Sequence, residues 1–139
     1  MEEQHIASAF DRDLEGIQAR IMKMGGLVEA AIVDAARALE TRDEELAQQV
    51  RSNDKAIDEM EEQINVEAAR LIAIRSPTAS DLRLVLSVMK ISANLERIGD
   101  YAKNMAKRTV VLAQGPSVQD STSALRRMAR EVERMLKDA

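Results

Sequence analysis

Residues 77–109 read PTASDLRLVLSVMKISANLERIGDYAKNMAKRT, and this stretch decides the fold class. Thr78 and Asp81, just after Pro77, form a helix-start signal. Beyond them, apolar residues recur in alternating steps of four and three, which predicts a long helix packed side by side with other helices. The expected core positions are Leu84, Val88, Ile91, Leu95, Ile98, Ala102, Met105 and Thr109.

The same spacing occurs in two segments upstream. The first places in the core Phe10, Leu14, Ile17, Ile21, Met24, Val28, Ala31 and Ala35. The second places there Leu46, Val50, Asn53, Ile57, Met60, Ile64, Glu67, Leu71 and Ile74. Asn53 and Glu67 are polar, and we expect them to set helix register, as buried polar groups do in coiled coils.

Short breaks separate these segments. Thr41-Arg-Asp-Glu44 resembles a capping box that opens the second helix, with Asp43 as the alternative cap. The second helix ends at Arg75-Ser-Pro-Thr78, and Gly115-Pro116 ends the third. Connections this short make neighbouring helices antiparallel. The sequence therefore predicts an all-α fold: an antiparallel up-down three-helix bundle over residues 1–114, with a linker and a fourth, partial helix from near Ser117 in residues 115–139.

Composition indicates a helical protein that is not an enzyme. Only one Phe, one Tyr and no Trp occur, and cysteine is absent, which excludes thiolate chemistry. We find no phosphate-cradling glycine loop and no nucleophile with a recognisable activator. The net charge of −4, with acids and bases mixed, argues against nucleic-acid binding. No secretory signal and no membrane span is evident, so we expect a cytoplasmic protein without direct membrane insertion.

Two carboxylates are the first candidate functional residues. Glu96 and Asp100 are four residues apart, so they share one face of the third helix. Like charges at this spacing weakly oppose helix formation, which suggests compensation by a basic neighbour or a bound cation. A solvated acidic face with Lys103 and Lys107 as neutralising neighbours is the alternative interpretation.

The predicted hairpin brings more acids to the same level. An antiparallel turn at Ser76 and Pro77 places Glu96 and Asp100 opposite the part of the second helix that carries Asp54, Asp58 and Glu61. If these flanks face each other, four or five carboxylates gather between two helices, although the sequence does not specify the side. Such a cluster suits hard cations, with Mg, Mn and Fe as the natural candidates.

A basic stripe is the second candidate. Arg83, Lys90 and Arg97 recur every seven residues along the third helix. The stripe is either an ordinary exposed face or a docking strip for an acidic partner surface.

Four motifs together resemble the PhoU family, the accessory regulators of the bacterial phosphate-specific transport system. They are Met22-Lys-Met-Gly-Gly-Leu-Val28, Asp54-Lys-Ala-Ile-Asp58, Pro77-Thr-Ala-Ser-Asp-Leu-Arg83 and Leu95-Glu-Arg-Ile-Gly-Asp100. The resemblance covers roughly residues 6–114 and implies two similar three-helix bundles. Residues 1–114 would be the first, and residues 115–139 the start of a second, truncated one that lacks its own copy of the last motif.

The resemblance also implies a function and a site. It assigns metal binding to Glu96, Asp100, Asp54 and Asp58, with a divalent or ferric ion (Fe, Mg, Mn or Zn) as the cofactor. It implies a negative regulator of the phosphate-starvation response that contacts the transporter ATPase subunit and a phosphate-sensing histidine kinase, and that forms a homodimer. The alternative function, based on the carboxylates, is a metal-binding or metal-sensing helical bundle.

Overall fold

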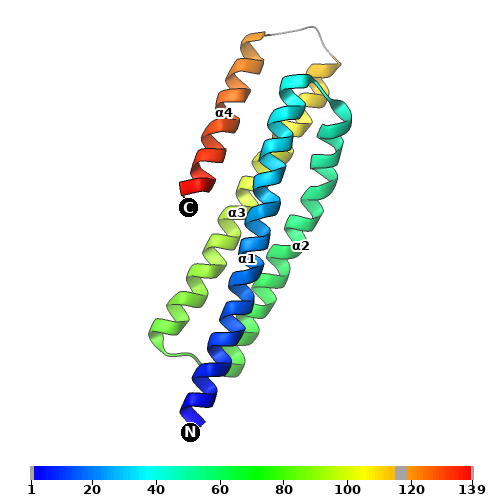
Figure 1. The fold of residues 1–139 in the computed structure, drawn as a ribbon. Coiled ribbons are helices and arrows are strands. Elements are labelled where there is room, and N and C mark those ends of the chain that lie inside the picture. Colours follow the sequence, from blue (N-terminus) through cyan, green and yellow to red (C-terminus); the bar gives the residue numbers. More distant parts are fainter. Residues whose placement is uncertain (1, 115–118, 139) are drawn as a thin grey trace.

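Four helices make up the described part of the chain. The computed structural model describes the backbone of residues 2–114 and 119–138 and the side chains of residues 8–114 and 125–138. The helices are α1 (Glu2–Thr41), α2 (Glu44–Arg75), α3 (Ala79–Ala113) and α4 (Gln119–Asp138). The first three lie side by side in an up-down-up bundle, and α4 runs back along one half of it (Figure 1). The all-α prediction is confirmed.

The connection between α1 and α2 uses Asp43 as the cap. The Leu46 backbone N–H donates to Asp43 Oδ1 at 3.0 Å. Thr41 is the last residue of α1, and its hydroxyl donates to the Arg37 carbonyl at 2.8 Å. The capping box based on Thr41 is therefore wrong, because this hydroxyl satisfies a carbonyl at the end of one helix instead of an N–H at the start of the next.

The connection between α2 and α3 agrees with the sequence. Ser76 ends α2 in the left-handed conformation (φ 43°), and its N–H donates to the Ile72 carbonyl at 3.3 Å. Thr78 then accepts a hydrogen bond from the Asp81 N–H at 3.4 Å. Gly115, Pro116 and Ser117, which were expected to end α3 and begin the next helix, lie outside the described residues; α3 ends at Ala113 and α4 begins at Gln119.

The core of α1 follows the predicted heptad. Ile21 is half-buried, and every other expected position of this helix is buried. In α2 and α3, one heptad row is right and the other is displaced by one residue, except at Met60 and Met105, which are buried as expected. The correct rows are Val50, Ile57, Ile64 and Leu71 in α2, and Val88, Leu95, Ala102 and Thr109 in α3.

The displaced rows change which residues are inside. In α2, Ala47, Asp54 and Ala68 are buried, whereas Asn53 is exposed and Glu67 is half-buried. The register role predicted for Asn53 and Glu67 is thus wrong. The corresponding buried row of α3 is Val85, Ser92, Gly99 and Ala106. Among the residues expected inside, these lie on the surface: Ile74, Leu84 and Ile91.

Small side chains explain the displacement. A Cβ added to Gly99 would lie 3.4 Å from two carbon atoms of Ile57 and 3.7 Å from Asp54 Oδ1, so α3 approaches α2 closely here. A close approach favours the row of small residues over the neighbouring row of bulky ones, because the larger side chains do not fit between the two backbones. In α3, the bulkier Leu84 and Ile91 fitted the heptad spacing, but each lies one position from a residue of the buried row.

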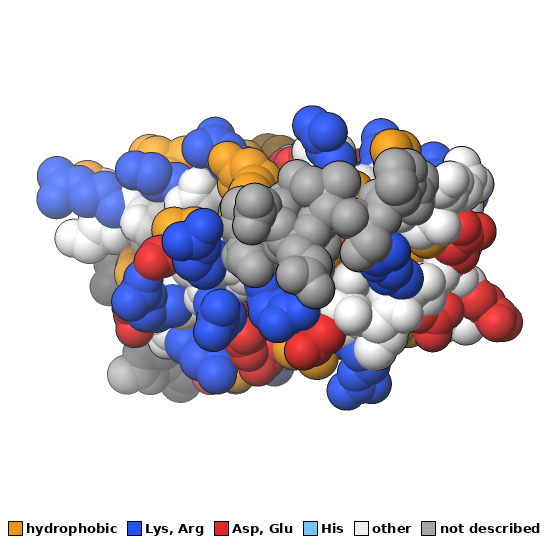
Figure 2. Space-filling model, turned by 90° about the horizontal axis from the view of Figure 1, so that it is seen from above, with side chains coloured by type: hydrophobic (Ala, Val, Ile, Leu, Met, Phe, Trp, Pro, Cys, Tyr) orange, Lys and Arg blue, Asp and Glu red, His pale blue; other side chains and the backbone are white. Residues whose placement is uncertain are grey.

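The fourth helix packs mainly on α1 and less on α3. Among its side chains from residue 125 to 138, those of Ala129 and Val132 are buried. The proposed boundary between residues 1–114 and 115–139 stays a prediction. Seen from the end of the bundle, Lys and Arg side chains gather on the side where α4 lies, and several acidic side chains lie on the opposite side (Figure 2). In the part of the chain that the structure describes, no helix is long and apolar enough to cross a membrane.

The packing at Gly99 predicts a position-specific effect. We expect Gly99→Leu to destabilise the fold by about 1–3 kcal/mol, because the new side chain must displace Ile57 or Asp54. Gly26→Leu is the matched control, since a Cβ there meets nothing within 4 Å. Urea unfolding followed by circular dichroism measures both. Equal stability of the two variants would contradict the close approach.

Candidate functional site

Three aspartates from two helices converge at the α2–α3 seam. Asp54 and Asp58 lie one turn apart on α2, and Asp100 comes from α3. One carboxylate oxygen from each lies within 4.8 Å of the others. The missing side chain at Gly99 contributes to this, because Asp54 occupies space beside the α3 backbone at that point. The sequence placed these residues at one level, and the structure shows that they share one side.

Lys103 compensates part of the negative charge. Its Nζ lies 3.4 Å from Asp54 Oδ2, one turn beyond Gly99 on α3. Asp54 itself is only 3% exposed. A buried carboxylate needs such a partner, since removing a charge from water without compensation is costly. Lys103 was expected to neutralise Glu96 and Asp100, whereas the ion pair in the structure joins it to Asp54.

One lysine is not enough to offset the acids around it. Burial raises the pKa of Asp54, and the charge of Asp58 raises it further, while Lys103 opposes both effects. Burial is also the main cause that raises the pKa of Glu61, followed by the charges of Asp58 and Asp100.

Glu96 has the most strongly raised pKa in this region. Burial first, then the charge of Asp100 and a hydrogen bond between the two carboxyl groups, raise the pKa of Glu96 to about 7. The charges of Glu61 and Asp58 add to the shift. Five carboxyl groups therefore act on one another in this cluster, which we call the acidic cluster: Asp54, Asp58, Glu61, Glu96 and Asp100.

The acidic cluster fits a hard cation. Oxygens that touch one ion at about 2.0–2.4 Å lie at most about 4.8 Å apart. The three aspartate oxygens lie within 4.8 Å of one another, so they meet this limit. The surplus negative charge also favours a cation. An all-carboxylate donor set suits Mg²⁺, Mn²⁺ and iron better than Zn²⁺, which proteins usually hold with imidazole or thiolate ligands. The residues present therefore fit such an ion, and binding itself stays a prediction.

The basic stripe lies elsewhere on α3. Arg83, Lys90 and Arg97 are all exposed and take no part in the acidic cluster. Beside two of them, the structure exposes Leu84 (49%) and Ile91 (46%), which the sequence had placed in the core. This apolar row was missed because a heptad assignment takes every bulky aliphatic residue at the expected spacing as buried.

The raised pKa of Glu96 predicts how stability depends on pH. Between an unfolded value of 4.5 and a folded value of about 7, the folded chain binds a proton that the unfolded chain lacks. Stability from this group therefore falls as pH rises through that window and then stays constant. With chelator present, we expect Glu96→Gln to stabilise the fold by about 1 kcal/mol at about pH 8 and not at about pH 4.

Urea unfolding at both pH values measures this difference. Glu29→Gln, on the exposed face of α1, is the control and should show no pH-dependent gain. A gain of equal size at both pH values for Glu96→Gln would contradict the shifted pKa.

Comparison with known proteins gives the family. The PhoU domain family matches residues 21–109. The chain is 40% identical over 135 residues to the "Phosphate-specific transport system accessory protein PhoU homolog" of Pseudomonas aeruginosa, covering 97% of this chain and 56% of that protein. It is also 40% identical over 134 residues to the "Phosphate-specific transport system accessory protein PhoU" of Escherichia coli. This match covers 96% of this chain and 55% of that protein.

Solved structures agree with these matches. The crystal structure of PhoU from Pseudomonas aeruginosa superposes with a TM-score of 0.87 at 40% identity, over 92% of this chain and 61% of that one. The phosphate transport system regulatory protein PhoU from Streptococcus pneumoniae gives 0.80 at 32% identity, over 93% and 60%. The chain spans about half the length of the curated relatives it matches. On its sequence and its fold, the chain belongs to the PhoU family.

Proposed function

We propose that this chain is an accessory regulator of phosphate-specific transport that represses the phosphate-starvation response when phosphate is plentiful. The observation that supports this most is the identity of 40% over 97% of the chain to a protein named for that transport system. We further propose that it acts in the cytoplasm as a homodimer, without catalysis, by contacting the transporter ATPase subunit and a phosphate-sensing histidine kinase.

The exposed side of α3 supports a role in protein contact. Arg83 and Lys90 are each followed by an exposed aliphatic residue, Leu84 and Ile91. Arginine and bulky apolar side chains next to each other are typical of interface centres, where the apolar part excludes water around the charged contacts. We therefore place the partner surface on Arg83, Lys90 and Arg97 together with this apolar row.

The regulatory role is tested in cells. Deleting the gene should raise alkaline phosphatase activity strongly in phosphate-replete medium, because repression is lost. Expressing residues 1–139 in the deletion strain should restore repression. If this chain is not sufficient, the two-bundle form that the family resemblance implies is expressed in the same test. We expect Arg83→Gln/Lys90→Gln/Arg97→Gln to restore it poorly, since three charges of the contact are removed.

The matched control changes three exposed basic residues away from the stripe. Lys23→Gln/Arg37→Gln/Lys55→Gln, on α1 and α2, removes the same charge and should repress as the parent does. Unchanged phosphatase activity after deletion would overturn the regulatory proposal. Equal repression by both triple variants would overturn only the location of the partner surface.

The acidic cluster favours a second candidate function, in which the chain binds or senses a metal ion. The observation behind it is the convergence of Asp54, Asp58 and Asp100 within 4.8 Å. The ion would be held between α2 and α3, and Lys103 would remain paired with Asp54 Oδ2. Mg²⁺, Mn²⁺ and iron are the ions we propose, with Zn²⁺ less suited.

Titration with Mn²⁺ tests this function. We expect Asp58→Asn/Asp100→Asn to weaken binding by about tenfold or more, because two of three charged ligands are lost. This pair leaves Asp54 and Lys103 intact, so the buried ion pair is kept. Glu59→Gln/Glu62→Gln, two exposed acids of α2, is the charge-matched control and should bind as the parent does. Equal affinity in both double variants would exclude this site.

A further inference from the structure

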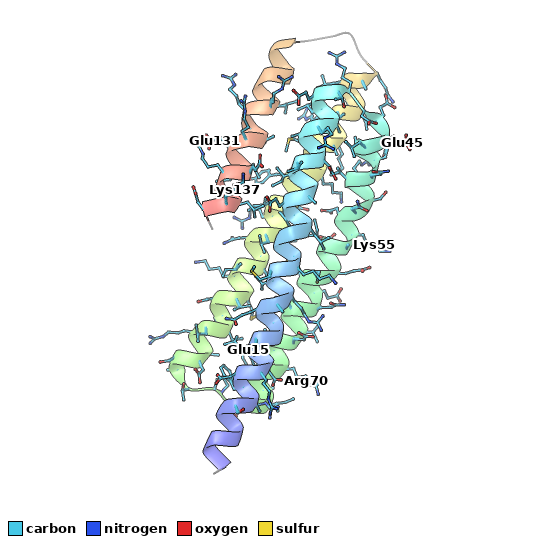
Figure 3. The ribbon with its side chains drawn as sticks, viewed as in Figure 1. Glu15, Glu45, Lys55, Arg70, Glu131 and Lys137 are labelled. Atoms are coloured by element: carbon cyan, nitrogen blue, oxygen red, sulfur yellow. The ribbon has the colours of Figure 1, made fainter. Side chains whose placement is uncertain are left out.

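A hollow lined by arginines lies between α1 and α2, away from the acidic cluster. It has a volume of about 450 Å³ and sits at the end of the bundle where Arg70 of α2 comes beside α1, near Glu15 (Figure 3). The charged residues that line it are Arg12, Asp13, Arg20, Glu67, Arg70 and Arg75. We call it the arginine hollow.

Two of the four arginines are held by acids across the hollow. Arg20 Nη2 lies 2.9 Å from Glu67 Oε1, and its Nη1 donates to Gln63 Oε1 at 2.9 Å. Arg75 Nε donates to Asp13 Oδ2 at 3.0 Å. Both pairs join α1 to α2. These two ion pairs connect the two sides of the hollow, and in each of them an acid neutralises one arginine.

The other two arginines have no such partner. Arg12 on α1 and Arg70 on α2 are exposed, and neither has a hydrogen bond or ion pair among the side chains that the structure describes. Among the described residues that line it, the hollow therefore has two more positive charges than negative ones. Like-charged guanidinium groups at one site repel each other, so an anion between them would be stabilised by both.

A glycine keeps the space open. Gly16 lines the hollow, one turn beyond Arg12 and one turn before Arg20, and a Cβ added to it meets nothing within 4 Å. Glycine inside a helix costs about 1 kcal/mol relative to alanine, yet no close packing requires it here. The space above it is part of the hollow itself.

We propose that the arginine hollow binds a small multivalent phosphoryl anion, either inorganic phosphate or a short phosphate chain such as pyrophosphate. Planar guanidinium groups match the oxygens of phosphoryl groups with paired hydrogen bonds. A dianion neutralises the two excess charges. The volume corresponds to about fifteen water molecules, so it admits more than one phosphoryl group.

The arginine side chains, and not a helix end, would attract the anion. The C-terminal end of α2 lies beside the hollow, because Arg75 is its last residue. That end of a helix carries partial negative charge and opposes an anion. Binding therefore depends on the arginine side chains. The site shares no residue with the acidic cluster or the basic stripe, so it stands independently of the regulatory role.

Calorimetric titration of the chain tests the proposal, with phosphate, pyrophosphate, sulfate and citrate compared at one ionic strength. We expect saturable binding of phosphate or pyrophosphate that is tighter than that of sulfate and citrate. Arg12→Gln/Arg70→Gln should weaken it by about tenfold or more. Arg37→Gln/Arg127→Gln, two exposed arginines outside the hollow, should change it by less than about twofold.

A second variant fills the hollow without removing charge. Gly16→Leu should weaken binding by about tenfold, whereas Gly26→Leu, in open space on the same helix, should leave it unchanged. Circular dichroism confirms that each variant is folded. Preference for pyrophosphate over phosphate identifies a phosphate chain as the ligand, and the reverse identifies the single ion. Equal affinity for all four anions, or unchanged binding in both hollow variants, overturns the proposal.

Discussion

The close approach of α2 and α3 at Gly99 is the contact on which the acidic cluster depends. It brings Asp54 against the α3 backbone and buries it almost completely. A buried carboxylate then needs compensation, and Lys103 supplies one positive charge for a group of five acids. Burial first, and then the negative charge that Lys103 leaves uncompensated, raise the pKa values of Glu96, Glu61 and Asp54. Helix packing therefore determines the electrostatics of the site, because a side chain at position 99 that is much larger than alanine would have to displace Ile57 or Asp54.

Acidic and basic side chains gather on different surfaces of the molecule, so the net charge of −4 describes no single region. Acids dominate the α2–α3 seam, while arginines dominate the hollow between α1 and α2. Screening at physiological salt limits the reach of exposed charges to about 8 Å, so each region acts on ligands through its own local field. The two proposed ligands, a cation at the acidic cluster and an anion in the arginine hollow, would therefore not compete with each other.

The sequence was most reliable where large apolar residues fill the core, as in α1 from Phe10 to Ala35. It failed by one residue where small side chains form the seam, because size and spacing alone do not show how closely two helices approach. The same limit applies to the site. Hairpin arithmetic placed Asp54, Asp58 and Asp100 at one level, but only the packing at Gly99 determines that they face one another. The arginine hollow had no signal at all, since Arg12 and Arg70 are far apart in sequence and each looks like an ordinary surface residue.

The orientation of α3 in the bundle determines which of its side chains face the acidic cluster and which face outward. Because Ser92 and Gly99 face inward, Leu84 and Ile91 face outward beside Arg83 and Lys90, so α3 has one face in the acidic cluster and another in the proposed partner surface. Glu96 and Arg97 are neighbours in the chain, yet the first is half-buried in the cluster and the second is exposed. A cation or proton that changes the charge of the α2–α3 seam acts on the same continuous 35-residue helix that carries the basic stripe. Any coupling between metal and partner binding therefore has α3 as its most direct route, whereas the arginine hollow, on α1 and α2, would reach the partner surface only through the shared core.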